Sequence, residues 1–179
     1  GDIFYGKIKK WNDPAIAALN IGTPLPNADI VVAYRKVGAS GTYVLSSYIA
    51  KNNPEWNSNI GVGLTIPWPT GHGMETIKDM AAFIKETPYS IGFTEFSHVI
   101  KNSLKYVRLK NRAGEFVKPS PDSIAAAARN ATWAADNGFY NELTDGAGTG
   151  TWPMTSASFV LLRKVSDKPE HSRETLKFF

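Results

Sequence analysis

The sequence predicts an α/β fold with a mixed, mostly parallel sheet flanked by helices. Strand-like and helix-like stretches alternate along the 179 residues, which is typical of parallel sheets with crossover helices. No internal repeat interrupts that alternation. Hydrophobic residues make up 42% and charged residues 20%, as in folded domains that bury a core, so the chain is long enough and apolar enough for one.

Composition excludes several functional classes. The net charge is +4, but no run of five basic residues occurs, so we expect no nucleic-acid partner. The chain has no cysteine, which excludes disulfides and thiolate metal sites, and we expect neither a metal nor a cofactor because histidines and carboxylates lack ligand-like spacing. No apolar run reaches the roughly 18 residues that span a membrane.

The first half of the chain predicts helix, strand, turn and helix in that order. Asn12 or Asp13 can cap a short helix over 12–20, with Pro14 in its first turn. The β-rich stretch 29–34 is expected to form a buried strand. A glycine turn leads from it into a helix over 42–53, and residues 61–73 read as a loop.

The second half continues the alternation. Ile77, Met80, Ala81 and Ile84 mark one face of a helix that ends before Thr87-Pro88. Ser120 is a strong cap for a helix over 121–134. The remaining expectations are strands over 89–96, 104–109 and 155–164, a turn within 111–119, a loop over 144–153 and a last helix from 168.

The glycine turn between the first strand and its helix is the main candidate for a binding site. In open α/β sheets, ligands bind beyond the carboxyl ends of the strands, against helix N-termini. Small residues over Gly38–Thr42 let the backbone approach a ligand, while Ser40 and Thr42 can donate hydroxyl protons. Arg35 can grip two oxygens of a tetrahedral anion. An oxyanion site and an ordinary capped turn both fit this spacing.

Catalytic interpretations fit the same residues less well. A serine hydrolase using Ser40 would need the pattern G-x-S-x-G, and Thr42 stands where the last glycine belongs. The only histidines available as a base are His72, His98 and His171, none of which has a characteristic spacing. The phosphate-loop pattern G-x-x-x-x-G-K-[ST] is absent. We therefore expect a protein that is not an enzyme.

Several blocks in fixed order resemble the phosphate-specific periplasmic binding proteins, the solute-binding components of bacterial phosphate ABC importers. The resemblance covers essentially the whole chain. Its blocks are GDIFYGKIKKWNDPAIAALN, LPNADIVVAYRKVGASGTYVLSSYIAKNNPEW, IPWPTGHG, ETPYSIGFTEFSHV and TWPMTSASFVLLRK. The family fold is a type II periplasmic binding protein, in which two α/β lobes close on a ligand.

The resemblance implies how the chain is organised. Residues 1–153 would form the second lobe, and 154–179 would form a hinge or return strand followed by the start of a first-lobe helix. Both chain ends are expected to be internal positions of a longer protein. The implied partners are inorganic phosphate, the membrane permease of the importer and the remainder of the same chain. The implied location is periplasmic or extracellular, either free or lipid-anchored.

The family's site residues carry over only in part. Ser40, Gly41 and Thr42 match its S-G-T and would hold phosphate oxygens. The family arginine lies four residues before the serine, where this chain has Lys36; Arg35 lies five before and is the favoured gripping residue because its fork suits a tetrahedral anion.

Two departures from the family pattern bear on ligand specificity. The acidic residue of the family loop has no counterpart among residues 37–39, and the family's G-G-K-G-N-like loop is replaced by GHGMETIK. A binding protein or sensor domain for another oxyanion and a purely structural domain therefore remain alternatives.

Overall fold

A three-stranded parallel sheet organises the body of the protein. The computed structural model describes residues 1–161, 163 and 165–178. Strand β1 (Val31–Arg35) lies between β2 (His72–Met74) and β3 (Ser90–Ile91), and both pairings are parallel. The sequence VVAYR suits this central position because it is rich in β-branched and apolar residues, and Val32 and Ala33 are buried. The predicted α/β class with a mostly parallel sheet is confirmed.

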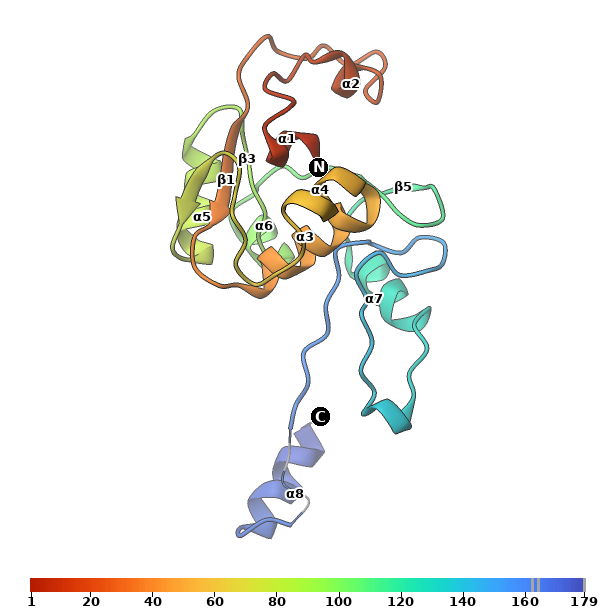
Figure 1. The fold of residues 1–179 in the computed structure, drawn as a ribbon. Helices are drawn as coiled ribbons and strands as arrows, with labels where there is room; N and C mark the ends of the chain where they lie inside the picture. Colours follow the sequence, from red (N-terminus) through yellow and green to blue (C-terminus); the bar gives the residue numbers. More distant parts are fainter. Residues whose placement is uncertain (162, 164, 179) are drawn as a thin grey trace.

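Helices cover both faces of this sheet (Figure 1). On one face lie α3 (Ser40–Asn52) and α4 (Pro54–Asn59), and on the other lies α5 (Ile77–Glu86). Val32 and Ile91 belong to or pack against the core cluster that contains Leu45 of α3. A Cβ on Gly92 would instead lie 2.7 Å from the sulfur of Met80 in α5. Since side chains alternate along a strand, Val32 faces the α3 layer and Ala33 faces the α5 layer.

An aromatic core lies between the sheet and the α3–α4 layer. Trp56 is fully buried, and its indole N–H donates to the Gly61 carbonyl over 3.0 Å. Trp68 stacks on both Tyr34 and Phe93, with ring centroids 5.2 and 5.7 Å apart. This packing joins the end of β1 to the segment that follows β3.

The remaining elements surround this body. They are α1 (Asp2–Tyr5), α2 (Pro14–Ala17), α6 (Phe96–Lys101), the antiparallel pair β4 (Leu109–Lys110) and β5 (Phe116–Val117), α7 (Pro121–Arg129), a 3₁₀ turn η1 (Ala135–Asn137) and α8 (Pro169–Phe178). The expected helix starts at Pro14, near Ile77 and after Ser120 are confirmed, with Asp13, Thr76 and Ser120 as the caps.

Four expectations from sequence need correction. Residues 61–73 are not only a loop, because 72–74 form β2 against β1. The strand expected over 89–96 is only Ser90–Ile91, and a short helix, α6, follows from Phe96. The strand expected over 104–109 is reduced to a two-residue pair with 116–117. These short elements depend on partners distant in sequence, which local periodicity does not reveal.

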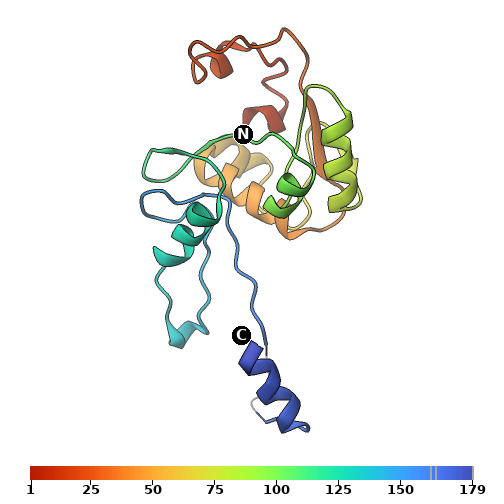
Figure 2. The same cartoon turned by 180° about the vertical axis from the view of Figure 1, so that it is seen from behind.

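The strand expected over 155–164 is the fourth correction. Among its described residues, 155–161 and 163, none is in a strand, because no other described segment pairs with them. Phe159, Val160 and Leu161 are 51%, 58% and 90% exposed. Figures 1 and 2 show this segment leaving the body and ending in α8. Across the described part of the chain, no helix has the length and apolarity required to cross a membrane.

Candidate oxyanion site

The glycine turn lies at the carboxyl edge of the sheet, between the end of β1 and the start of α3. Ala39 is the N-cap residue of α3, with an extended backbone, and no side chain caps this 13-residue helix. The Ala39 N–H donates to the Leu64 carbonyl over 2.9 Å, which anchors the turn to the neighbouring loop. The first N–H groups of a helix lack intrahelical acceptors, so an uncapped start offers donors to an anion.

Thr42 supplies a second and independent indication of a ligand. Its side chain is 0% exposed, and its Oγ1 has no hydrogen-bond partner within the described residues. A buried hydroxyl without a partner costs about 1–3 kcal/mol, so native proteins rarely keep one without a reason. A bound oxyanion at the start of α3 would satisfy this hydroxyl.

Ser40 and Gly41 complete the first turn of α3. Ser40 is exposed, which leaves its hydroxyl accessible to a ligand. Gly41 is partly buried, and a Cβ placed on it would lie 3.4 Å from the Phe93 ring. The segment that follows β3 therefore packs directly against the turn. The structure brings all three members of the predicted S-G-T segment together at one helix start.

Arg35 lies on the α5 side of the sheet. Strand alternation places it on the same side as Ala33, and its Nη2 donates to the Glu75 carbonyl over 2.7 Å. Its Nε is buried and has no partner among the described residues. The guanidinium is thus held just before the N-terminus of α5 while keeping one free donor.

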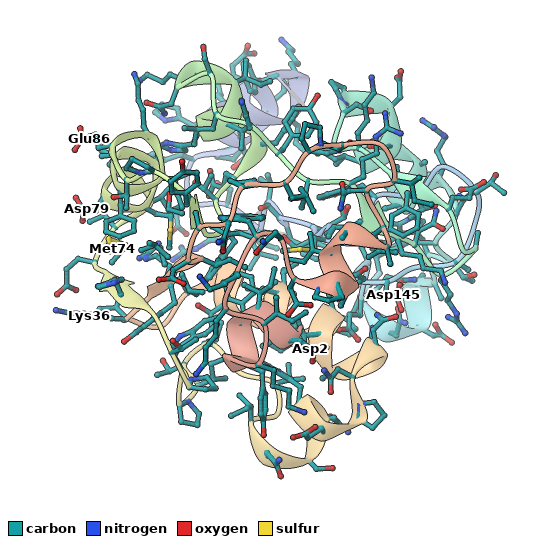
Figure 3. All side chains as sticks on the ribbon, turned by 90° about the horizontal axis from the view of Figure 1, so that it is seen from above. Asp2, Lys36, Met74, Asp79, Glu86 and Asp145 are labelled. Atoms are coloured by element: carbon teal, nitrogen blue, oxygen red, sulfur yellow. The ribbon has the colours of Figure 1, made fainter. Side chains whose placement is uncertain are left out.

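Lys36 lies on the opposite side, with Tyr34, towards the α3 layer. A Cβ on Gly73 would meet both the Lys36 and Tyr34 side chains, at 2.8 and 3.2 Å, which confirms that the two share a face. The Lys36 Nζ pairs with the Glu75 carboxylate at 2.6 Å. The hydrogen bond to Glu75 raises the pKa of the Lys36 ammonium above its ordinary value. Figure 3 shows Lys36 next to Met74 at the outer edge of the molecule.

Glu75 is the residue of this region that sequence reasoning missed. It lies 40 residues from Arg35 yet contacts it through the main chain and Lys36 through the side chain. In the sequence, the only feature that pointed to this region was that GHGMETIK differs from the family's loop. The contact itself could not be predicted locally, because it depends on the parallel pairing of β1 with β2.

The three histidines that the catalytic alternative could use as a base lie in three different elements. No histidine is hydrogen-bonded to Ser40 within the described residues, and His72 instead packs against the Phe83 ring, with centroids 5.6 Å apart. His98 lies in α6 and His171 in α8. The described residues also contain no group of three or more His, Asp or Glu side chains that could hold a metal ion. A serine hydroxyl acts as a nucleophile when an adjacent base activates it, whereas hydroxyls, main-chain N–H groups and cations can bind an anion without one.

Together, the parallel sheet and the uncapped helix start place the candidate site where open α/β domains bind ligands, at the carboxyl edge of the sheet. Comparison with known proteins then gives the family. A sequence model described as the PBP superfamily domain matches residues 2–178, and the chain belongs to this superfamily.

Curated relatives are similar over nearly the whole chain. The "Phosphate-binding protein PstS" of Pasteurella multocida is 44% identical over 178 residues, covering 99% of this chain and 52% of the relative. The proteins of the same name in Haemophilus influenzae and Xylella fastidiosa are 42% and 38% identical, again over 99% of this chain, and 53% and 49% of their own lengths are covered. The chain spans about half the length of the curated relatives it matches.

Proposed function

We propose that this chain binds inorganic phosphate, without catalysis, as part of the solute-binding component of an ABC phosphate importer. The observation that carries the proposal is the buried, unpartnered Thr42 hydroxyl at the uncapped start of α3. The relatives that share this sequence are named phosphate-binding proteins. An oxyanion is the ligand that such a helix start accommodates best.

Binding exchanges the hydration of phosphate for fixed donors. The Ser40 and Thr42 hydroxyls and the Gly41 N–H lie within one helical turn, so they can bind neighbouring oxygens of one tetrahedral anion. The positive end of the α3 dipole adds a favourable field along its whole first turn.

The cation that completes the site is Arg35 or Lys36. Arg35 offers a planar fork and a free Nε, but it faces the α5 side of the sheet. Lys36 faces the α3 side, and its ammonium pairs with the Glu75 carboxylate. Comparing Arg35→Gln with Lys36→Gln separates them. The variant that loses more phosphate affinity identifies the gripping residue, and equal losses would mean that both act through their charge alone.

We propose that the rest of the site comes from a longer protein. Residues 1–153 act as one lobe, and 154–179 return towards a second lobe that supplies further contacts. The exposed apolar residues Phe159, Val160 and Leu161 support this, because exposed runs of this kind normally gain a covering partner. In this proposal the assembled protein is periplasmic or extracellular, free or lipid-anchored, and delivers phosphate to a membrane permease.

Calorimetric titration with phosphate, and with sulfate as the control, tests the proposal on two proteins. The longer protein should bind phosphate selectively, whereas the 179-residue chain should bind weakly and discriminate poorly. Tight and selective binding by the short chain would contradict the two-lobe arrangement. If the longer protein does not bind phosphate, the ligand assignment is wrong. If it binds a different oxyanion instead, the second candidate function, a binding protein for that anion, is favoured.

A further inference from the structure

Glu75 occupies an unusual position beside the candidate site. It contacts both basic residues that can grip the anion: its carboxylate pairs with Lys36 at 2.6 Å, and its main-chain carbonyl accepts from Arg35 at 2.7 Å. Whichever of the two grips the ligand, Glu75 is already bonded to it. No sequence motif predicts this arrangement.

We infer that Glu75 is a specificity-determining residue of the oxyanion site, one that disfavours doubly charged anions by placing a fixed negative charge on its cationic side. This inference rests on the proposed function of the site. Arg35 and Lys36 both bond to Glu75, so its carboxylate offsets one of their two positive charges. The remaining attraction suits a singly charged anion, which needs less compensation than a doubly charged one.

The main chain of Glu75 is held next to Arg35 and Lys36 by the elements on either side of it. Gly73 and Met74 pair with Tyr34 and Arg35 in the sheet, so the main chain that leads to Glu75 is fixed beside β1. The next residue, Thr76, caps α5. The main chain of Glu75 is therefore anchored on both sides, by a strand pairing and by a helix cap.

The physical basis is that Coulomb energy is linear in the charge of the ligand. If removing the Glu75 charge strengthens binding of a monoanion by some factor, the same change strengthens binding of a dianion at that site by the square of the factor. The Lys36 and Glu75 side chains are about half exposed, at 54% and 53%, so solvent screens the charge of Glu75. We therefore expect its removal to raise the affinity for a monoanion by a factor of about three. A dianion should then gain about tenfold.

Glu75→Gln tests the inference because it removes the charge while keeping the side-chain size and the main-chain contact to Arg35. The probes are inorganic phosphate and inorganic sulfate at about pH 5.5, where inorganic phosphate carries mainly one negative charge and sulfate carries two. NMR shifts of the Gly41 and Thr42 amides in the 179-residue chain report local binding, even when dissociation constants reach tens of millimolar. Glu55→Gln is the matched control, since Glu55 also pairs with a lysine, Lys7, and is similarly exposed.

The expected result is a gain of about tenfold in sulfate affinity and about threefold in phosphate affinity for Glu75→Gln, with no change for Glu55→Gln. Raising the salt concentration to about 1 M should reduce the difference, because the screening length falls to about 3 Å. Equal factors for the two anions, no change, or weaker binding of both would overturn the inference while leaving phosphate binding intact. Failure of both anions to shift the amides of the unsubstituted chain and of Glu75→Gln would overturn the inference, whereas the proposed function is overturned only if the longer protein also fails to bind phosphate.

Discussion

The starts of α3 and α7 solve the same physical problem in opposite ways. At α7, the Ser120 hydroxyl accepts from the Ser123 N–H over 3.1 Å, and the Ser123 hydroxyl accepts from the Ser120 N–H over 2.9 Å. At α3 the corresponding position is Ala39, which has no oxygen to offer. The first turn of α7 has side-chain acceptors for its N–H groups, whereas the first turn of α3 has none among the described residues.

The difference indicates that a site can be recognised by a stabilising interaction that the protein omits. An N-cap residue typically contributes about 1 kcal/mol, and α5 and α7 both have reciprocal capping boxes. At α3 the omission coincides with the unpartnered Thr42 hydroxyl, so two unmet needs lie in one helical turn. A bound oxyanion would meet both. Four substitutions test this comparison, and they follow from the largest expected effect to the smallest.

Thr42→Val should have the largest effect on binding. The change keeps the side-chain shape but removes a hydrogen bond to a charged ligand, which is worth about 1.5–3 kcal/mol, so phosphate affinity should fall by about 10- to 100-fold. The free energy of unfolding without ligand should be unchanged or slightly higher, because the substitution removes a buried hydroxyl that has no hydrogen-bond partner in the described part of the chain. Titration and thermal unfolding measure the two quantities. A loss of stability with unchanged affinity would mean that Thr42 is simply part of the core.

Ser120→Ala should show the reverse pattern at α7. Removing this cap should lower the free energy of unfolding by about 1 kcal/mol, because the Ser123 N–H loses its acceptor. Phosphate affinity should be unchanged. Denaturant unfolding gives the stability, and the same titration gives the binding. A marked change in affinity would show that the two helix starts are coupled.

Ala39→Ser would give α3 the cap that it lacks. The new hydroxyl should stabilise the ligand-free protein by about 0.5–1 kcal/mol, while competing with the anion for the first N–H groups. Phosphate affinity should therefore fall several-fold as stability rises. The expected outcome is that stability rises while phosphate affinity falls. A variant that gains stability and keeps full affinity would show that the anion does not bind these N–H groups.

Gly41→Ala should have the smallest effect. Alanine keeps the N–H that the anion needs, and its Cβ would meet the Phe93 ring at 3.4 Å, which is close but tolerable. Helix propensity should add about 0.5–1 kcal/mol to stability, and affinity should change by about twofold or less. A large loss of affinity would show that the ligand approaches the Gly41 Cα directly.

The sequence by itself determined the class of fold and the location of the candidate site. The alternation of apolar and helical patterns predicted the parallel sheet, because local periodicity reflects which side of each element is buried. Cap residues such as Ser120 marked helix starts, since their hydrogen bonds are made within one turn. The S-G-T segment at 40–42 was found for the same reason: its donors are neighbours along the chain.

Tertiary structure alone decided everything that depends on residues distant in sequence. The pairing of 72–74 with β1 created a strand that local pattern did not indicate, and it carried Glu75 to Arg35 and Lys36. Strand alternation then separated those two basic residues onto opposite faces, a distinction that spacing could not make. The burial of the Thr42 hydroxyl likewise required the packed core. Local chemistry is specified by neighbouring residues, but burial and charge pairing are specified by which segments the fold brings into contact.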